Sequence, residues 1–157
     1  MGEKFRKYLK ELGGLDFEVL KEEWGFYKLA DGSLLRIKFV LVNVIKEGVD
    51  EAGNPIYSFS WTNVVGVISP ENLRGEPSTR RYSPKELTES IVEEDLEFKT
   101  LREGASIYKL EDGTILHIRP VLVMVSRTNK CDSKGMPIYL VNVQPIIKPK
   151  RAKKKQK

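Results

Sequence analysis

The sequence predicts an α+β fold that is mainly β and is formed by a tandem duplication of one helix-plus-four-strand unit. Three observations predict it: a long internal repeat, a short amphipathic helix at the start of each copy, and period-two alternation around an Asp-Gly turn in each copy. Residues 15–46 match residues 96–127 without a gap, and 15 of the 32 aligned pairs are identical. Two such units should pack with pseudo-two-fold symmetry, as one β-barrel or as paired small sheets. The residue pattern leaves both arrangements open.

Each copy begins with a segment of helical periodicity. In residues 3–12, apolar side chains recur at positions i, i+3, i+4 and i+7, namely Phe5, Tyr8, Leu9 and Leu12. In the second copy, Ser83 suits a helix N-cap, Pro84 suits the first helical position, and Glu86 completes a capping box. We therefore expect a helix at both sites. The apolar side of the second helix is expected to comprise Leu87, Ile91 and Val92.

Strand-like alternation follows each helix. Asp31-Gly32 and Asp112-Gly113 separate apolar segments and can adopt the positive φ angles of tight hairpins, so both are predicted turns. A second shared motif, Asp-x-x-Gly-x-Pro-Ile-Tyr, leads into the last strand of each copy at Ile56 and Ile138. The first two strands of the copies are expected around residues 17–19, 26–29, 98–100 and 107–110.

The third strand of each copy is long. Residues 35–39 alternate, whereas residues 40–44 are almost all apolar, which predicts a change from burial on one face to burial on both. Pro120 is the counterpart of Phe39 in the repeat, and proline cannot donate a hydrogen bond to a neighbouring strand. We therefore expect a bend, a bulge or a sheet edge at that point.

The repeat also predicts the organisation of the chain. The first repeat covers residues 1–69, a linker rich in Pro, Ser, Gly and Arg covers residues 70–82, and the second repeat covers residues 83–147. Residues 148–157 are strongly basic and offer only Ala152 to a core, so a disordered basic C-terminal tail is expected. Since each repeat alone would bury little surface, the two should form one compact body.

Composition and charge favour a cytoplasmic protein. No apolar stretch approaches the roughly 20 residues of a membrane helix, and we expect no membrane association. Cys131 is the only cysteine, so no intrachain disulfide can form, which fits a reducing compartment. The richness in Lys and Glu resembles that of thermophile proteins. The formal net charge is +5; because the last ten residues carry +7, residues 1–147 carry the difference, −2.

Basic residues are the strongest candidates for a binding site, with RNA or DNA as the partner. Clustered Lys and Arg displace counterions from a phosphate backbone and give salt-sensitive, sequence-independent binding. Within the body, Arg36 and Lys38 on an expected strand are matched by His117 and Arg119 in the second copy. The predicted nucleic-acid-binding residues are Lys148, Lys150, Arg151, Lys153, Lys154, Lys155, Lys157, Arg36, Lys38 and Arg119.

An aromatic row and a few potentially catalytic residues favour other interpretations. Tyr57, Phe59 and Trp61 would align on one face of a strand as a base-stacking platform, but their counterparts are less aromatic, so core packing is favoured. His117 lacks a nucleophile placed near it by any motif, and Cys131 sits in a polar turn. No spacing predicts a metal or cofactor site.

We therefore expect a non-enzymatic intracellular binding protein that associates with nucleic acid or a ribonucleoprotein through its basic C-terminal tail. The first alternative is a protein-interaction or assembly module that acts through the duplicated β body. The second alternative is a small-molecule binder or an enzyme whose site lies between the repeats.

Overall fold

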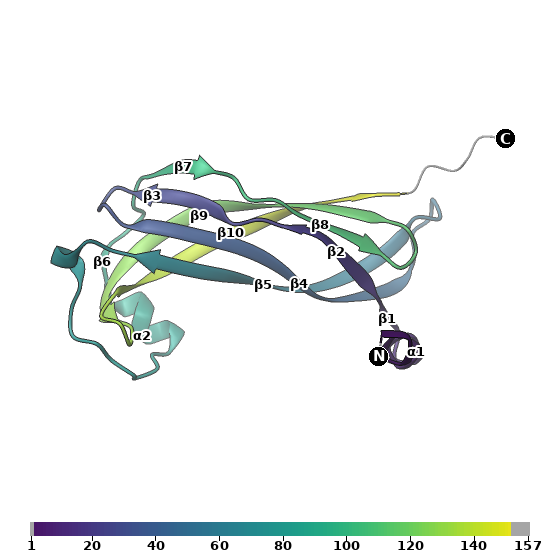
Figure 1. Ribbon diagram of the computed structural model, residues 1–157, viewed down its shortest axis with the longest axis horizontal. Helices are drawn as coiled ribbons and strands as arrows, with labels where there is room; N and C mark the ends of the chain where they lie inside the picture. The colour runs from purple at the N-terminus through teal and green to yellow at the C-terminus, as the bar shows by residue number, and fades with distance from the viewer. Residues whose placement is uncertain (1, 152–157) are drawn as a thin grey trace.

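Two antiparallel sheets of five strands each dominate the computed structural model, which describes residues 2–151 (Figure 1). The first sheet contains β1 (Gly14–Leu15), β3 (Gly25–Leu29), β4 (Leu34–Val49), β5 (Pro55–Ile68) and β7 (Phe98–Arg102). The second sheet contains β2 (Phe17–Glu22), β6 (Ile91–Glu93), β8 (Ser106–Leu110), β9 (Ile115–Cys131) and β10 (Pro137–Lys150). The remaining elements are α1 (Gly2–Glu11), the 3-10 turn η1 (Glu71–Leu73) and α2 (Pro84–Glu89). The prediction of a mainly β, α+β protein is confirmed.

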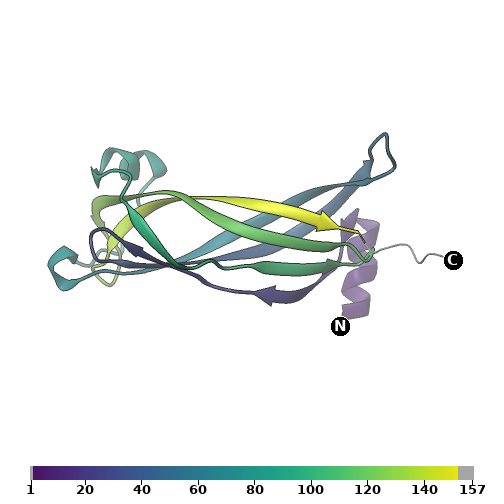
Figure 2. The ribbon, with the colours of Figure 1, turned by 90° about the horizontal axis from the view of Figure 1, so that it is seen from above.

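Each sheet takes one strand from the other half of the chain. β2 lies in the first repeat but pairs with β8, where Phe17 faces Leu110. β7 lies in the second repeat but pairs with β3, where Phe98 faces Leu29. Figures 1 and 2 show both strands running beside hairpins that are distant in the sequence. The two halves are therefore interlocked through their sheets.

The hydrophobic core lies between the two sheets and draws on both halves. The first core cluster comprises Tyr27, Leu29, Leu35, Ile37, Leu96, Leu122, Val125 and Tyr139. The second core cluster comprises Phe39, Leu41, Val44, Tyr108, Leu110, Leu116 and Ile118. Full burial of a Leu, Ile, Val or Phe side chain stabilises a fold by about 1.5–3 kcal/mol. Because each cluster mixes residues of the two repeats, this burial holds the halves together as well as the sheets.

Both predicted Asp-Gly hairpin turns are present. Leu29 N donates to Ser33 O over 2.9 Å, and Leu110 N donates to Thr114 O over 2.8 Å, closing the β3–β4 and β8–β9 hairpins. Within these two Asp-Gly turns it is the glycine that takes the positive φ, at 92° for Gly32 and 91° for Gly113. The aspartate before each glycine contributes through its side chain, which accepts the backbone N–H two residues on.

The long strands continue through their apolar segments by means of bulges. Val42 is unpaired between Leu41 and Asn43, and its counterpart Val123 is unpaired between Leu122 and Met124. Both bulged valines are exposed, so the expectation of burial on both faces was wrong. Because of the extra residue, the buried side chains change from Leu41 to Val44, three positions on instead of two. Pro120 itself is paired with Pro145, and the bulge lies three residues later.

The helices agree largely with the pattern. α1 occupies the expected segment, and α2 has the predicted capping box, in which Glu86 N donates to Ser83 Oγ over 3.1 Å. α2 ends at Glu89, so Ile91 and Val92 lie in β6 instead of on the helix, where Ile91 faces Thr128. No helix among the described residues has both the length and the apolar character needed to cross a membrane.

The last strand is longer than the sequence pattern indicated. β10 runs to Lys150, with Lys148 opposite His117 and Lys150 opposite Ile115, whereas the basic tail was expected to begin at Lys148. The expectation relied on the lack of apolar residues, but an edge strand needs only backbone pairing on one side, and it tolerates Pro145 and Pro149. The expected tail residues 152–157 lie outside the described part of the chain.

Candidate nucleic-acid interface

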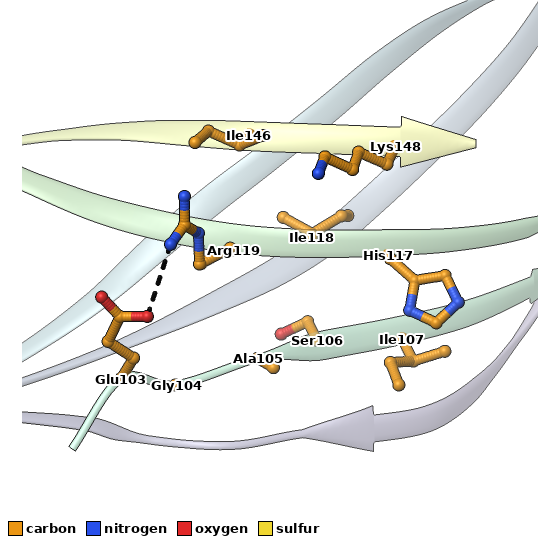
Figure 3. A pocket seen from close by; sticks show the side chains of 10 residues that line it. All are labelled: Glu103, Gly104, Ala105, Ser106, Ile107, His117, Ile118, Arg119, Ile146 and Lys148. Carbon is orange, nitrogen blue, oxygen red and sulfur yellow. Dashed lines mark ion pairs between the residues drawn. The ribbon is translucent and has the colours of Figure 1, made fainter. Parts of the chain in front are cut away.

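A groove of about 310 Å³ on the outer face of the second sheet brings two of the predicted residues together (Figure 3). Leu116 and Ile118 point into the core, so strand alternation directs His117 and Arg119 outward. β10 adds Ile146 beside Arg119 and Lys148 beside His117. The loop between β7 and β8 forms the other wall, with Glu103, Gly104 and Ala105.

The groove is cationic with one acidic group at its margin. Arg119 Nη1 lies 3.5 Å from Glu103 Oε2, and these side chains are 53% and 59% exposed. Figure 3 shows this ion pair on one side of Ile118 and His117 on the other, with the Lys148 side chain above. A solvated ion pair of this kind is weak, so Arg119 stays available to another anion. The arrangement suits contact with phosphate groups along a backbone.

The predicted residues Arg36 and Lys38 lie elsewhere, on the outer face of the first sheet. Arg36 Cζ is 5.5 Å from the centroid of the Trp24 ring and 5.6 Å from that of Phe26. Lys38 Nζ is 5.3 Å from the Trp24 centroid. Arg102 of β7 adds a third cation, with Cζ 5.7 Å from the Phe26 centroid. The predicted residues Arg36 and Lys38 are therefore both packed on aromatic rings.

Trp24, Phe26 and Arg102 are candidate binding residues that sequence reasoning missed. Trp24 and Phe26 have an i, i+2 spacing, as do Arg36 and Lys38, which could have suggested two facing rows. Their repeat counterparts Ala105 and Ile107 are not aromatic. Arg102 could not be found, because it reaches this face only through the exchange of β7 into the first sheet.

The chain matches no known protein-family model, no curated protein and no solved structure.

Two further predicted residues, Lys150 and Arg151, lie outside the lining of the groove. Lys150 lies at the end of β10, and Arg151 Nη2 donates to the carbonyl of Gly53 over 3.1 Å, at the turn between β4 and β5. Lys153, Lys154, Lys155 and Lys157 lie outside the described residues. Within residues 2–151, no three His, Cys, Asp or Glu side chains gather as a metal site would require.

The duplicated aspartates each bind a tyrosine of the other half. Tyr139 Oη donates to Asp31 Oδ2 over 2.6 Å, and Arg127 Nη1 donates to the same oxygen over 3.0 Å. Tyr57 Oη donates to Asp112 in the same way. Figures 1 and 2 place the two hairpin turns at opposite ends of the molecule, so the two carboxylates do not form a dyad.

These contacts shift the pKa values of the groups involved. Burial alone would raise the pKa of Asp31, but hydrogen bonds from Tyr139, Ser33 and Arg127 lower it below the ordinary value. Burial and the hydrogen bond to Asp31 raise the pKa of Tyr139. Burial, with a hydrogen bond to Glu22, raises the pKa of Tyr108 to about 12. All three groups keep their ordinary charge at neutral pH, which suits a structural role.

The aromatic row of β5 packs largely as expected. Tyr57 and Phe59 pack against the second core cluster. Trp61 is 42% exposed, and its ring stacks on the buried Phe39 with centroids 6.0 Å apart. The row is therefore mainly part of the core.

Proposed function

We propose that this protein is a non-enzymatic nucleic-acid-binding protein in which the groove of the second sheet and the basic C-terminal residues together contact a phosphate backbone. The observation that supports this most is the position of Lys148 in β10, beside His117 and near Arg119. Through Lys148, the groove is continuous in sequence with the basic end of the chain. Such a row can neutralise successive phosphates and release their counterions.

We also propose that the two repeats are related by a pseudo-two-fold axis. Three reciprocal features support it: the pairing of β2 with β8 and of β7 with β3, the Tyr–Asp contacts in both directions, and the bulges at Val42 and Val123. Under this proposal the two outer faces are equivalent in position but differ in side chains. Lys148 of the groove, for example, corresponds to Gly66 in the first repeat.

The test is a salt titration of binding to duplex DNA and to RNA. Arg119→Gln combined with Lys148→Gln is expected to reduce the magnitude of the log-log salt slope for duplex DNA by about 2, since each lost phosphate contact removes about 0.9. Removal of residues 152–157 deletes four lysines and is expected to reduce it by up to about 3.6. This truncation leaves β10 intact, whereas truncation before Lys148 would shorten it.

Lys85→Gln is the control, because it removes one positive charge from the exposed surface of α2, which Figure 1 shows well apart from β8. It should leave the slope within error of the wild-type value. If the groove variant and the truncation both behave like the Lys85 variant, the proposed interface is wrong.

A further inference from the structure

The outer face of the first sheet has a composition that the groove of the second sheet lacks. Two aromatic rings, Trp24 and Phe26, lie under three cationic side chains, Arg36, Lys38 and Arg102. We call these five residues the aromatic–basic face. Among the described residues, these three cations make a single ion pair, from Arg102 to Glu23. Glu23 also pairs with Lys21, so the net charge of the face stays positive.

An apolar hollow of about 400 Å³ adjoins this face, with Phe26 and Arg36 in its lining. Its other walls include Leu34, Ile68 and Leu101, which are 52%, 61% and 56% exposed. Large aliphatic side chains so exposed, next to each other and rimmed by cations, are typical of a binding surface. The hollow and the aromatic–basic face together offer an apolar contact surface with positive charge at its edge.

Gly66 on β5 contributes to this surface because it has no side chain. A Cβ atom at this position would lie 3.1 Å from Arg36 Cγ, so glycine lets the Arg36 stem lie close against β5. Arg36 lies on β4, where it is paired with Gly66 of β5 on one side and with Phe26 of β3 on the other. The guanidinium group lies over the rings of Trp24 and Phe26, and a guanidinium plane can itself stack on a base.

We propose that the aromatic–basic face and its hollow bind unpaired bases, so that the preferred ligand is a single-stranded nucleic acid. This rests on the proposed function and specifies its substrate class. Lys38 and Arg102 turn from the rings to the flanking phosphates, which frees Trp24 and Phe26, together with the Arg36 guanidinium, to stack on bases. A duplex hides the faces of its bases and engages only the charges. Stacking on aromatic side chains accepts any base, so binding is sequence-tolerant.

The two tryptophans of the chain provide a direct test, since Trp24 lies on this face and Trp61 stacks on Phe39. Trp61→Phe leaves Trp24 as the only indole reporter, and Trp24→Phe leaves Trp61. The probes are RNA and DNA single strands of about 15 nucleotides and blunt hairpin duplexes of matched sequence. We expect single strands to quench the fluorescence of the Trp61→Phe variant and to leave that of the Trp24→Phe variant unchanged.

A second measurement separates stacking from charge. At about 0.5 M salt, where phosphate contacts are strongly weakened, Trp24→Leu and Phe26→Leu are each expected to reduce single-strand affinity at least about fivefold. Trp24→Phe should retain most of the affinity, because it keeps a ring. The Trp61→Phe variant is the matched control and should bind as the wild type does. Comparing the RNA and DNA strands shows whether the 2′-hydroxyl contributes.

Three results would overturn this inference. Equal binding of duplexes and single strands, unaffected by Trp24→Leu and Phe26→Leu but reduced in the Arg119/Lys148 variant, would reject the stacking face and leave the proposed function standing. Absence of binding to any probe would reject both. A change in Trp24 fluorescence with protein concentration alone would show that a second copy of the chain covers this face.

Discussion

The residues kept in both repeats make contacts between the halves as well as local turns. Asp31 and Asp112 were predicted as hairpin residues, and that role is present. Their partners Tyr139 and Tyr57 belong to the second shared motif, some 108 and 55 positions away in sequence. The turn chemistry was readable because it involves adjacent residues, whereas the tyrosine contacts depend on how the halves pack. The same holds for the candidate binding residues. Arg119 and Lys148 were predicted from the sequence, whereas Arg102 was not, because its position depends on the pairing of β7 with β3.

Tyr139→Phe should destabilise the fold more than Tyr57→Phe. The Tyr139 hydroxyl contacts Asp31, Ser33 and Ser69 in a buried network, and the Asp31 side chain is only 4% exposed. Leaving such buried groups unsatisfied costs about 1–3 kcal/mol. Tyr57 contacts the more exposed Asp112, so its loss should cost less. Urea denaturation of both variants measures the difference, and a larger loss for Tyr57→Phe would contradict the assignment.

Stability should fall in acid partly through Asp31. Its pKa in the folded state is lowered from 3.8, so its contribution is present above that value and is lost as the pH falls through the folded pKa. Asp31→Asn should be less stable than the wild type at neutral pH but should lose less additional stability below about pH 4. Thermal melts from neutral pH to about pH 2 give both quantities. Parallel curves for the two proteins would show that Asp31 titrates without affecting stability.

At the scale of the elements, periodicity identified the strands and missed their irregularities. The apolar run from Val40 to Val44 was interpreted as burial on both faces, whereas a bulge buries Leu41 and Val44 and leaves Val42 exposed. Only pairing distinguishes them, and Val42 has no partner in β5. The end of β10 was missed for a related reason, since backbone pairing with β9 needs no apolar side chain.

The glycines of two hairpins should respond differently to substitution. Gly32 has a φ of 92°, and a Cβ atom there would lie 3.2 Å from Pro70 Cγ. Gly53 has a φ of 83° with nothing within 4 Å of a Cβ atom. Both alanine variants should lose about 1–2 kcal/mol from backbone strain, and Gly32→Ala should lose more because of Pro70. Chemical denaturation ranks them, and the reverse order would count against a role for Pro70 at this turn.

For the whole molecule, the sequence predicted a duplicated, mainly β chain but could not reveal which strands pair. β2 could pair with β3 of its own repeat or with β8 of the other, and the repeat gives both candidates the same Tyr-Lys-Leu pattern. Local pattern cannot separate two nearly identical partners. The choice is made by packing, since Phe17 joins the second core cluster and Phe98 packs on the first.

An isolated second repeat, residues 83–151, should not be a stable monomer. Its β8 would lack β2, and its β7 would lack β3. Two copies can restore both pairings by exchanging β7, because Phe98 and Leu101 of β7 match Phe17 and Leu20 of β2. We expect a dimer in sedimentation equilibrium, alongside a monomeric full-length chain at the same concentrations. A folded monomer of the isolated repeat would contradict this expectation.

The exchange of β2 and β7 also determines when the chain can fold during synthesis. The edge of β3 stays unpaired until residues 98–102 have left the ribosome, and β2 has no neighbour until residues 106–110 follow. Most of the chain must therefore emerge before either sheet is complete. Non-local pairing of this kind slows folding and leaves strand edges exposed meanwhile. The nascent first repeat should consequently be the stage of synthesis at which the protein most needs a chaperone.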